Sequence, residues 1–189
     1  MQEPILEVIT GCMFSGKTEE LIRRLRRLEH GSRLEDWTEA FLVILPTTKR
    51  REERNIKKIF RQRVHQISDP EEVFDLLSPT QRVVAFDEAH FLSESLADVV
   101  EKLVKSGRRV IVSGLNVTYT GDPWPTMARI LCKAEDIYLC VAVCAKCGKN
   151  RAVRSLRLVT SRELILIGDK DEKTEYEPRC LACFEPPTD

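Results

Sequence analysis

The sequence predicts an α/β fold, in which a mostly parallel sheet flanked by helices is followed by a small β-rich lobe. Three observations lead to this prediction. Short apolar segments alternate with helix-like segments through residues 1–142, a glycine-rich turn joins the first segment of each kind, and two Cys-x-x-Cys pairs stand near the C-terminal end. Alternating strands and helices are typical of a parallel sheet that is covered on both faces.

The elements are expected in the following order. Residues 5–10 form the first strand, because residues 5–9 are mostly apolar and β-branched. Residues 17–30 form the first helix, in which Leu21, Leu25 and Leu28 recur at helical spacing. Further strands are expected over residues 41–46, 82–87, 109–114 and 137–142. Further helices are expected near residues 70–77 and over residues 93–106 and 125–134, with a charged helical or irregular stretch over residues 48–63.

The glycine-rich turn carries a phosphate-binding motif. Residues 11–18 read GCMFSGKT and fit the pattern G-x-x-x-x-G-K-[ST], whose backbone N–H groups cradle nucleotide phosphates. A helix that begins in this turn presents unsatisfied N–H groups and a partial positive charge to a phosphate. Lys17 adds a full charge at the β- and γ-phosphates, and the Thr18 hydroxyl can ligate Mg²⁺. The motif predicts a P-loop NTPase-type sheet whose phosphate site consists of Gly11, Cys12, Met13, Phe14, Ser15, Gly16, Lys17 and Thr18.

A second motif follows the strand expected over residues 82–87. Asp87 and Glu88 stand at its carboxyl end, where P-loop enzymes hold Mg²⁺ through an acidic residue of a neighbouring strand. We expect Asp87 to hold the magnesium ion with Thr18, and Glu88 to act as a general base on an incoming hydroxyl or water. Paired carboxylates at a strand end are often only solvated, but the phosphate loop upstream favours the magnesium interpretation.

Residues 87–90 read DEAH, which is also the signature of a large class of helicases. Such motors clamp the nucleotide between two ATPase-type lobes. Because a domain takes about 100–200 residues, a chain of 189 residues has room for one full lobe and a small appendage. The length therefore argues against a helicase.

Four cysteines form two Cys-x-x-Cys pairs, Cys144 with Cys147 and Cys180 with Cys183. Two such pairs are typical of a closed, structural zinc site with four thiolate ligands. A disulfide or redox dithiol is the alternative, but it would leave three odd thiols, and the sequence shows no signal peptide. Zinc in a reducing cytoplasm fits better. We expect residues 1–142 to form the nucleotide-binding domain and residues 143–189 a zinc-binding lobe that the metal stabilises.

Charge is balanced over the whole chain, with 30 basic and 30 acidic residues. No overall field therefore attracts nucleic acid, and no apolar run approaches the length that spans a membrane. Residues 49–63 are a local exception, with eight basic and two acidic side chains. A solvated face is the favoured interpretation of this run. An arm over the triphosphate and a contact for an acidic partner stay open as alternatives.

In combination, these motifs resemble the cytosolic, zinc-containing P-loop thymidine kinases, the type II family, over nearly the whole chain. Residues 11–18 resemble the family's G-x-M-F-S-G-K-[ST], and residues 87–91, DEAHF, resemble its D-E-A-Q-F. Residues 114–116, GLN, with Tyr119 beyond them, are similar to a family segment of G-L-D and an aromatic residue. Residues 176–180, YEPRC, and the cysteine pairs complete the resemblance.

The resemblance implies that ATP with Mg²⁺ is the phosphate donor and that the 5′-hydroxyl of thymidine is the acceptor. It implies that Glu88 accepts the hydroxyl proton, that Lys17 and the loop amides stabilise the transferring phosphoryl group, and that Arg51 steadies Glu88 or the phosphates. The family closes a lasso-like loop over the base, which corresponds here to residues 164–168. The implied nucleoside pocket consists of Met13, Phe91, Leu115, Tyr119, Ser155, Leu164, Ile165, Leu166, Ile167, Gly168 and Tyr176. Without the resemblance, core packing would explain the aromatic residues equally well.

Family members commonly form homotetramers and are inhibited by thymidine triphosphate (dTTP), so both properties are expected by resemblance. The chain also departs from the family pattern. Asn116 and Lys49 replace aspartates, His90 replaces a glutamine, and the lasso is longer and more polar. Ser155 replaces a threonine that contacts the thymine methyl group, which removes a methyl contact of at most about 1 kcal/mol.

Two other functions stay open beside the salvage kinase, which the sequence favours. One is a zinc-ribbon P-loop ATPase that binds nucleic acid or a protein partner through residues 49–63. Such a protein would hydrolyse ATP slowly and would be indifferent to free nucleosides, whereas a salvage kinase would phosphorylate a pyrimidine deoxynucleoside. The other is a divergent homologue with altered nucleoside specificity.

Overall fold

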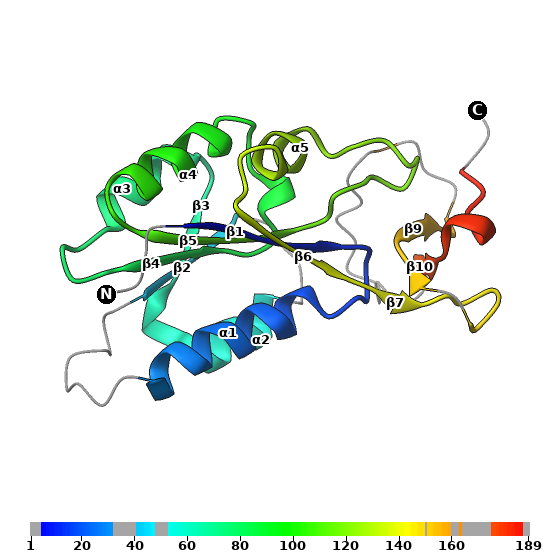
Figure 1. The fold of residues 1–189 in the computed structure, drawn as a ribbon, viewed down its shortest axis with the longest axis horizontal. Coiled ribbons are helices and arrows are strands. Elements are labelled where there is room, and N and C mark those ends of the chain that lie inside the picture. The colour runs from blue at the N-terminus through cyan, green and yellow to red at the C-terminus, as the bar shows by residue number, and fades with distance from the viewer. Residues whose placement is uncertain are drawn as a thin grey trace.

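The computed structural model describes residues 5–31, 41–47, 53–149, 151–159, 163 and 175–186. Within these residues, six parallel strands form a sheet in the order β3-β2-β4-β5-β1-β6 (Figure 1). The strands are β1 (Leu6–Gly11), β2 (Phe41–Pro46), β3 (Val64–Ile67), β4 (Val83–Phe86), β5 (Arg109–Gly114) and β6 (Asp136–Cys140). The sheet confirms the predicted α/β fold.

Helices cover both faces of this sheet (Figure 1). One face carries α1 (Lys17–Gly31) and α2 (Glu53–Phe60), and the other carries α3 (Val73–Leu76), α4 (Leu96–Lys105) and α5 (Pro125–Leu131). Neighbouring side chains of a strand point to opposite faces. In β1, Ile9 accordingly packs in one apolar cluster with Leu21 and Leu25 of α1, whereas Val8 packs in a second cluster with Leu103 of α4.

Strand β3 was not predicted from the sequence, in which no strand was expected between residues 48–63 and the helix near residues 70–77. Its sequence, VHQI, contains two polar residues, and it pairs only with β2 among the described strands. An edge strand needs fewer apolar positions than a central one, so its pattern is weak. The helix expected near residues 70–77 is a 3₁₀ turn, Pro70–Glu72, followed by the single turn of α3.

The C-terminal part of the chain is rich in β-structure, as predicted. Strand β7 (Ala142–Val143) pairs antiparallel with β8 (Arg151–Ala152), and β9 (Arg154–Arg157) pairs antiparallel with β10 (Tyr176–Arg179). The strand expected over residues 137–142 is thus divided between β6 and β7. The boundary between the two units at residue 142 stays a prediction. Among the described helices, none combines the length and the apolar character needed to cross a membrane.

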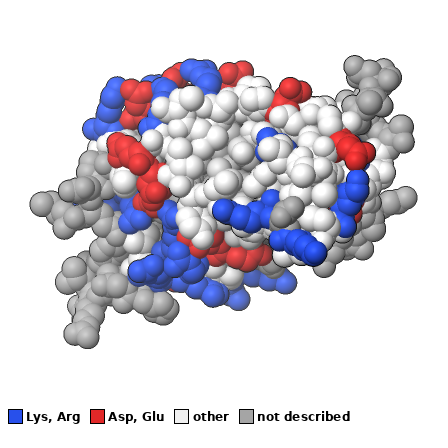
Figure 2. All heavy atoms as spheres, turned by 45° about the vertical axis from the view of Figure 1, so that its right-hand side comes forward, with Lys and Arg blue, Asp and Glu red and all other residues white. Residues whose placement is uncertain are grey.

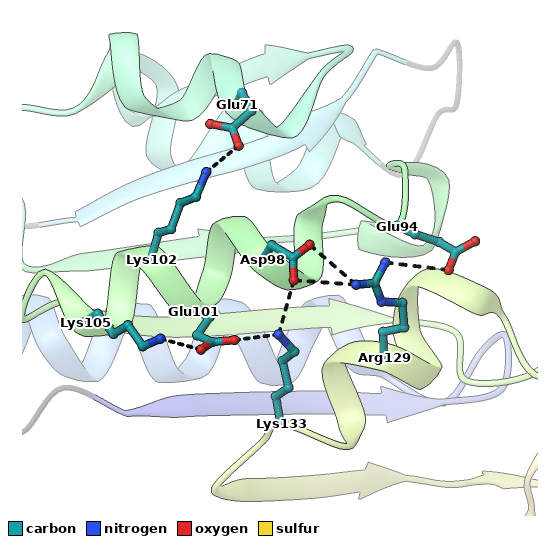
Figure 3. Close-up of polar contacts among 8 residues, drawn as sticks. All are labelled: Glu71, Glu94, Asp98, Glu101, Lys102, Lys105, Arg129 and Lys133. Carbon is teal, nitrogen blue, oxygen red and sulfur yellow. Dashed lines mark hydrogen bonds and ion pairs between the residues drawn. The ribbon is translucent and has the colours of Figure 1, made fainter.

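Ion pairs join α4 to α5 and to Lys133, which follows α5 in the chain (Figure 3). Lys133 contacts Asp98 at 3.2 Å and Glu101 at 2.5 Å, and Arg129 reaches the same Asp98 at 3.4 Å. Figure 3 also shows Lys105 bound to Glu101, and all of these side chains are at least partly exposed. Exposed pairs contribute about 0.2–1 kcal/mol each and are screened by salt. The network therefore aligns the two helices without being a main source of stability.

A buried carboxylate connects α1 to the sheet. Glu7 of β1 is 3% exposed and accepts hydrogen bonds from Arg24 of α1 and Arg109 of β5. Arg24 also donates to Glu20 at 2.9 Å, and Arg23 donates to Glu20 at 2.6 Å. A buried charge is tolerated when it is paired in this way. These contacts hold the helix that begins in the phosphate loop against β1 and its neighbour β5.

The pKa of Glu20 leads to a prediction about stability. The hydrogen bond from Arg23, together with that from Arg24, lowers the pKa of Glu20 from 4.5 to about 2. A lowered pKa means that the carboxylate stabilises the fold above pH 4.5 and that this contribution disappears as the pH falls toward 2. We expect Glu20→Gln to lower the melting temperature at neutral pH. The difference in melting temperature between this variant and wild type should shrink as the pH falls from 4.5 toward 2.

Thermal melts of both proteins across the acid range measure this effect. Glu19→Gln, which makes the same chemical change one residue away, is the control for general acid destabilisation. A difference in melting temperature between wild type and Glu20→Gln that stays constant toward pH 2 would contradict the prediction.

Candidate active site

The phosphate loop has a conformation that its glycines permit. Gly11 has φ of 147°, and a Cβ at this position would lie 2.2 Å from the carbonyl oxygen of Cys140. No side chain fits there, because β1 and β6 approach each other closely at this point. Phe14 has φ of 62°, in the left-handed region that residues other than glycine rarely adopt. Such strain is concentrated at functional sites, in agreement with the predicted role of this loop.

Lys17 is the first residue of α1 and lies over the loop. Its side chain is buried, and Nζ donates a hydrogen bond to the carbonyl oxygen of Cys12 at 2.8 Å. An ammonium group has three N–H donors, so two further donors are available to phosphate oxygens. The Ser15 hydroxyl donates to the same carbonyl at 2.8 Å. Both bonds hold the loop in the curved form that can surround a phosphate.

Asp87 lies beside the loop, at the carboxyl end of β4. Its Oδ2 accepts a hydrogen bond from the Thr18 hydroxyl at 2.9 Å, and its Oδ1 accepts one from the Ser113 hydroxyl at 2.7 Å. Burial raises the pKa of Asp87 above its ordinary value, although the bonds from Ser113 and Thr18 oppose this shift. A cation in this place would favour the ionised form. Hydroxyl and carboxylate oxygens are hard ligands, so Thr18 and Asp87 fit a magnesium ion.

Glu88 points to a different set of neighbours. It has φ of 53° and ψ of 32°, a left-handed conformation from which the chain enters the 3₁₀ turn Ala89–Phe91. The residue is 8% exposed, and Oε2 of its carboxylate lies 3.5 Å from Nε2 of His90. The unusual backbone at Glu88 therefore separates two adjacent carboxylates. Asp87 meets the phosphate loop, and Glu88 meets His90.

A small apolar cavity lies between the phosphate loop and the turn that follows Glu88. Its free space is about 20 Å³, roughly the room of one water molecule, so a nucleoside requires its walls to move. Every described residue that was predicted for the nucleoside pocket lines this cavity. They are Met13, Phe91, Leu115, Tyr119, Ser155 and Tyr176.

Three further residues line the cavity and were not predicted: His90, Val117 and Trp124. His90 was noted only as a departure from the family motif, and nothing in the sequence around Trp124 indicated a pocket. The ring of Trp124 lies 4.9 Å from that of His90 and 6.1 Å from that of Phe91, measured between centroids. Its indole N–H is buried without a hydrogen-bond partner among the described residues. These rings make up much of one wall.

Arg157 of β9 is another functional candidate that the sequence analysis missed. It is 7% exposed, and its guanidinium lies 3.5 Å from the ring centroid of Tyr119. It also donates to the hydroxyl of Tyr176 at 3.0 Å and to the backbone carbonyl of Glu163. Arg157 therefore positions two aromatic walls of the cavity. In the sequence it is one of several similar arginines near residues 151–157, so no local signal distinguishes it.

The small lobe is bonded directly to the phosphate loop. The backbone N–H of Met13 donates to the Ser155 hydroxyl at 2.9 Å, and the Cys12 thiol donates to the carbonyl of Ala152 at 3.4 Å. Ser155 was predicted to face the thymine methyl group. It does line the cavity, but its hydroxyl oxygen is engaged by the loop amide. The conformation of the loop thus depends on the position of β8 and β9.

The two cysteine pairs meet in space. The sulfur atoms of Cys144, Cys147, Cys180 and Cys183 all lie within 4.8 Å of one another. Backbone N–H groups, that of Cys180 foremost, lower the pKa of Cys144 to about 6, whereas hydrogen bonding to Cys180 raises the pKa of Cys183 to about 12. Crowded thiols of this kind favour a cation among them, and four sulfur ligands suit zinc. The residues present therefore fit a structural zinc ion.

Some predicted site residues lie outside the described part of the chain. They are Arg51, Leu164, Ile165, Leu166, Ile167 and Gly168, and Lys49 belongs with them. Asn116 is described, and its backbone carbonyl accepts a hydrogen bond from Trp124 N at 3.0 Å. Its side-chain oxygen is buried without a partner among the described residues.

Comparison with known proteins agrees with this geometry. Residues 4–184 match the family model described as thymidine kinase. A thymidine kinase from Rhodothermus sp. is 39% identical over 184 residues, which cover 96% of this chain and 82% of the relative. A thymidine kinase from Bdellovibrio bacteriovorus is 37% identical, over 97% of this chain and 87% of the relative, and one from Metamycoplasma arthritidis is 36% identical, over 96% and 90%. The chain therefore belongs to the thymidine kinase family.

Proposed function

We propose that this protein transfers the γ-phosphoryl group of ATP to the 5′-hydroxyl of thymidine, which yields thymidine monophosphate for deoxynucleotide salvage. One observation carries the proposal beyond family membership. The phosphate loop contributes Met13 to the wall of the aromatic cavity, and the turn after Glu88 contributes His90 and Phe91. A nucleoside bound in that cavity would have its sugar between the loop and the Glu88 carboxylate.

Each of the site residues is proposed to have a separate role in the reaction. Glu88 accepts the proton of the 5′-hydroxyl as the new O–P bond forms and the bond between the γ-phosphorus and ADP breaks. Lys17 and the amides of residues 11–18 stabilise the charge on the transferring group. Thr18 and Asp87 would hold Mg²⁺, which would supply positive charge to the β- and γ-phosphates. Arg51 is proposed to steady Glu88 or the phosphates, and residues 164–168 to cover the base.

The decisive experiment is phosphorylation of a nucleoside panel with zinc-replete protein, ATP and Mg²⁺. The panel contains thymidine, deoxyuridine, deoxycytidine and deoxyguanosine, and dTTP is added in a second series. We expect thymidine monophosphate as the main product, inhibition by dTTP, and loss of turnover in Lys17→Met. If ATP binds but no nucleoside is phosphorylated, the proposal fails. Slow ATP hydrolysis without nucleoside dependence would then favour an ATPase that serves another partner.

We also propose that the protein is cytoplasmic and that it is a homotetramer, in line with the resemblance to type II enzymes. A reducing cytoplasm keeps the cysteine thiols available to zinc. Support for an oligomer comes from β6, which ends the described sheet on one side. Ile137, Tyr138 and Leu139 in this strand are 50%, 47% and 43% exposed. Figure 2 shows a broad uncharged area on the face that it presents. Exposed apolar edge strands are usually covered by a partner.

The oligomer gives a further testable prediction. Light scattering after size exclusion should report about four times the chain mass of 21.7 kDa. Ile137→Lys should lower this mass, because a charge at the edge strand opposes pairing. Ile59→Lys, at an exposed isoleucine of α2, is the matched control. A wild-type protein that is monomeric, or an Ile137→Lys protein of unchanged mass, would argue against this interface.

A further inference from the structure

His90 occupies a defined position between the proposed base and the end of β5. Its Nδ1 accepts a hydrogen bond from the backbone N–H of Leu115 at 3.2 Å, and the residue is 3% exposed. A neutral imidazole carries one hydrogen on its two nitrogens. Because Nδ1 accepts, the hydrogen lies on Nε2, and Nε2 is the atom that stands 3.5 Å from Oε2 of Glu88. The backbone of Leu115 thereby selects the tautomer that offers an N–H to Glu88.

The surrounding structure holds the ring in this orientation. Gly114 permits the close approach, since a Cβ there would lie 3.3 Å from the backbone nitrogen of His90 and 2.8 Å from the sulfur of Met127. The rings of Phe91 and Trp124 lie 4.1 Å and 4.9 Å from the imidazole. With a backbone donor on one side and aromatic rings beside it, the imidazole has little freedom to rotate. Such preorganisation is what a catalytic carboxylate needs from its neighbours.

We infer that His90 is a positioning residue for Glu88, an inference that rests on the proposed kinase function. Its Nε2–H holds one oxygen of the carboxylate and leaves the other oxygen for the 5′-hydroxyl of the nucleoside. The proton of that hydroxyl goes to Glu88, and His90 neither gains nor loses a proton in the step. Donation from a neutral ring orients the carboxylate without the strong loss of basicity that a neighbouring cation would cause.

The separation of 3.5 Å between Nε2 and Oε2 exceeds the usual length of an N–H···O bond, about 2.7–3.2 Å. Catalytic hydrogen bonds are often long before the substrate binds and tighten in the complex. The hydroxyl of a bound nucleoside would draw the Glu88 carboxylate into a single orientation, in which His90 completes the bond.

A glutamine at this position could make both contacts. Its amide oxygen would accept from Leu115 N–H, and its NH₂ group would donate to Glu88. A leucine fills similar space and can make neither contact. His90→Leu and His90→Gln therefore separate the hydrogen bonds from the packing of the ring.

The test compares kcat and KM for thymidine in wild type, His90→Leu and His90→Gln, and repeats His90→Leu in a Glu88→Gln background. A misplaced catalytic group costs up to about 100-fold, so we expect His90→Leu to lower kcat roughly 10- to 100-fold and to change KM much less. His90→Gln should recover most of the loss. In the Glu88→Gln background, His90→Leu should have little further effect, because residues that act together are not additive. His65→Leu, on edge strand β3, is the matched control.

Three results would overturn the inference: unchanged kcat in His90→Leu, a loss confined to KM, or full additivity with Glu88→Gln. An independent test is nitrogen NMR of the wild-type imidazole rings. The chain has 3 histidines, and the signals of His90 are those that disappear in the spectrum of His90→Leu. The neutral tautomer with hydrogen on Nε2 is expected at neutral pH, and the other tautomer or a charged ring contradicts the inference. A wild-type enzyme that does not phosphorylate thymidine would instead overturn the proposed function, and with it this role.

Discussion

Glu88→Gln is expected to lower kcat for thymidine phosphorylation by about 100- to 10,000-fold, which is the usual contribution of general acid–base catalysis. The amide has the shape of the carboxylate but cannot accept the hydroxyl proton. ATP affinity should be retained, because the hydrogen bonds that hold the phosphate loop do not involve Glu88. Lys17 is bonded to the carbonyl oxygen of Cys12, and Thr18 is bonded to Asp87. Initial-rate kinetics and ATP titration measure the two effects separately.

Glu94→Gln is a suitable control for this variant. Glu94 is exposed and contacts Arg129 at 3.9 Å, on the surface formed by α4 and α5. The same chemical change there should leave kcat near the wild-type value. If Glu88→Gln keeps kcat within about ten-fold of wild type, another group is the base and the assignment of Glu88 is wrong.

Removal of the zinc ion proposed for the four-cysteine cluster is expected to abolish activity as well as to destabilise the small lobe. Metal binding contributes about 10–16 kcal/mol to the folding of zinc-finger peptides, and a small lobe has little core to replace it. Destabilisation of the lobe should also disturb the phosphate loop, because the Met13 N–H is hydrogen-bonded to Ser155 and the Cys12 thiol to Ala152. We therefore expect Cys144→Ser to lower both the melting temperature and ATP affinity.

Metal analysis of the purified protein should find about one zinc ion per chain in wild type and much less in Cys144→Ser, as four thiolate ligands hold one ion. Cys132→Ser is the control, because Cys132 is exposed and lies outside the four-cysteine cluster. A metal-free Cys144→Ser protein with wild-type ATP affinity would show that the loop does not depend on the small lobe.

The sequence was most informative where a function requires a local pattern. Residues 11–18 form one continuous loop, and their chemistry depends on neighbours in the chain, so the motif alone predicts its conformation. The alternation of apolar strands with helices was sufficient for the α/β fold, because strands buried on both faces must be apolar throughout. Family resemblance then added the six cavity residues, from Met13 to Tyr176, that no periodicity distinguishes from core residues.

By itself, then, the sequence determined the fold class, the phosphate loop, the acidic pair and the cysteine pairs. Tertiary structure alone decided that Leu115 N–H selects the tautomer of His90, that Arg157 stacks on Tyr119, and that Ser155 binds the phosphate loop. These contacts join residues 25 to 142 positions apart, or depend on the orientation of one side chain. They arise because the carboxyl ends of the parallel strands meet at one edge of the sheet, and because strand β9 of the small lobe lies against the phosphate loop there. Such contacts leave no periodic pattern in the chain.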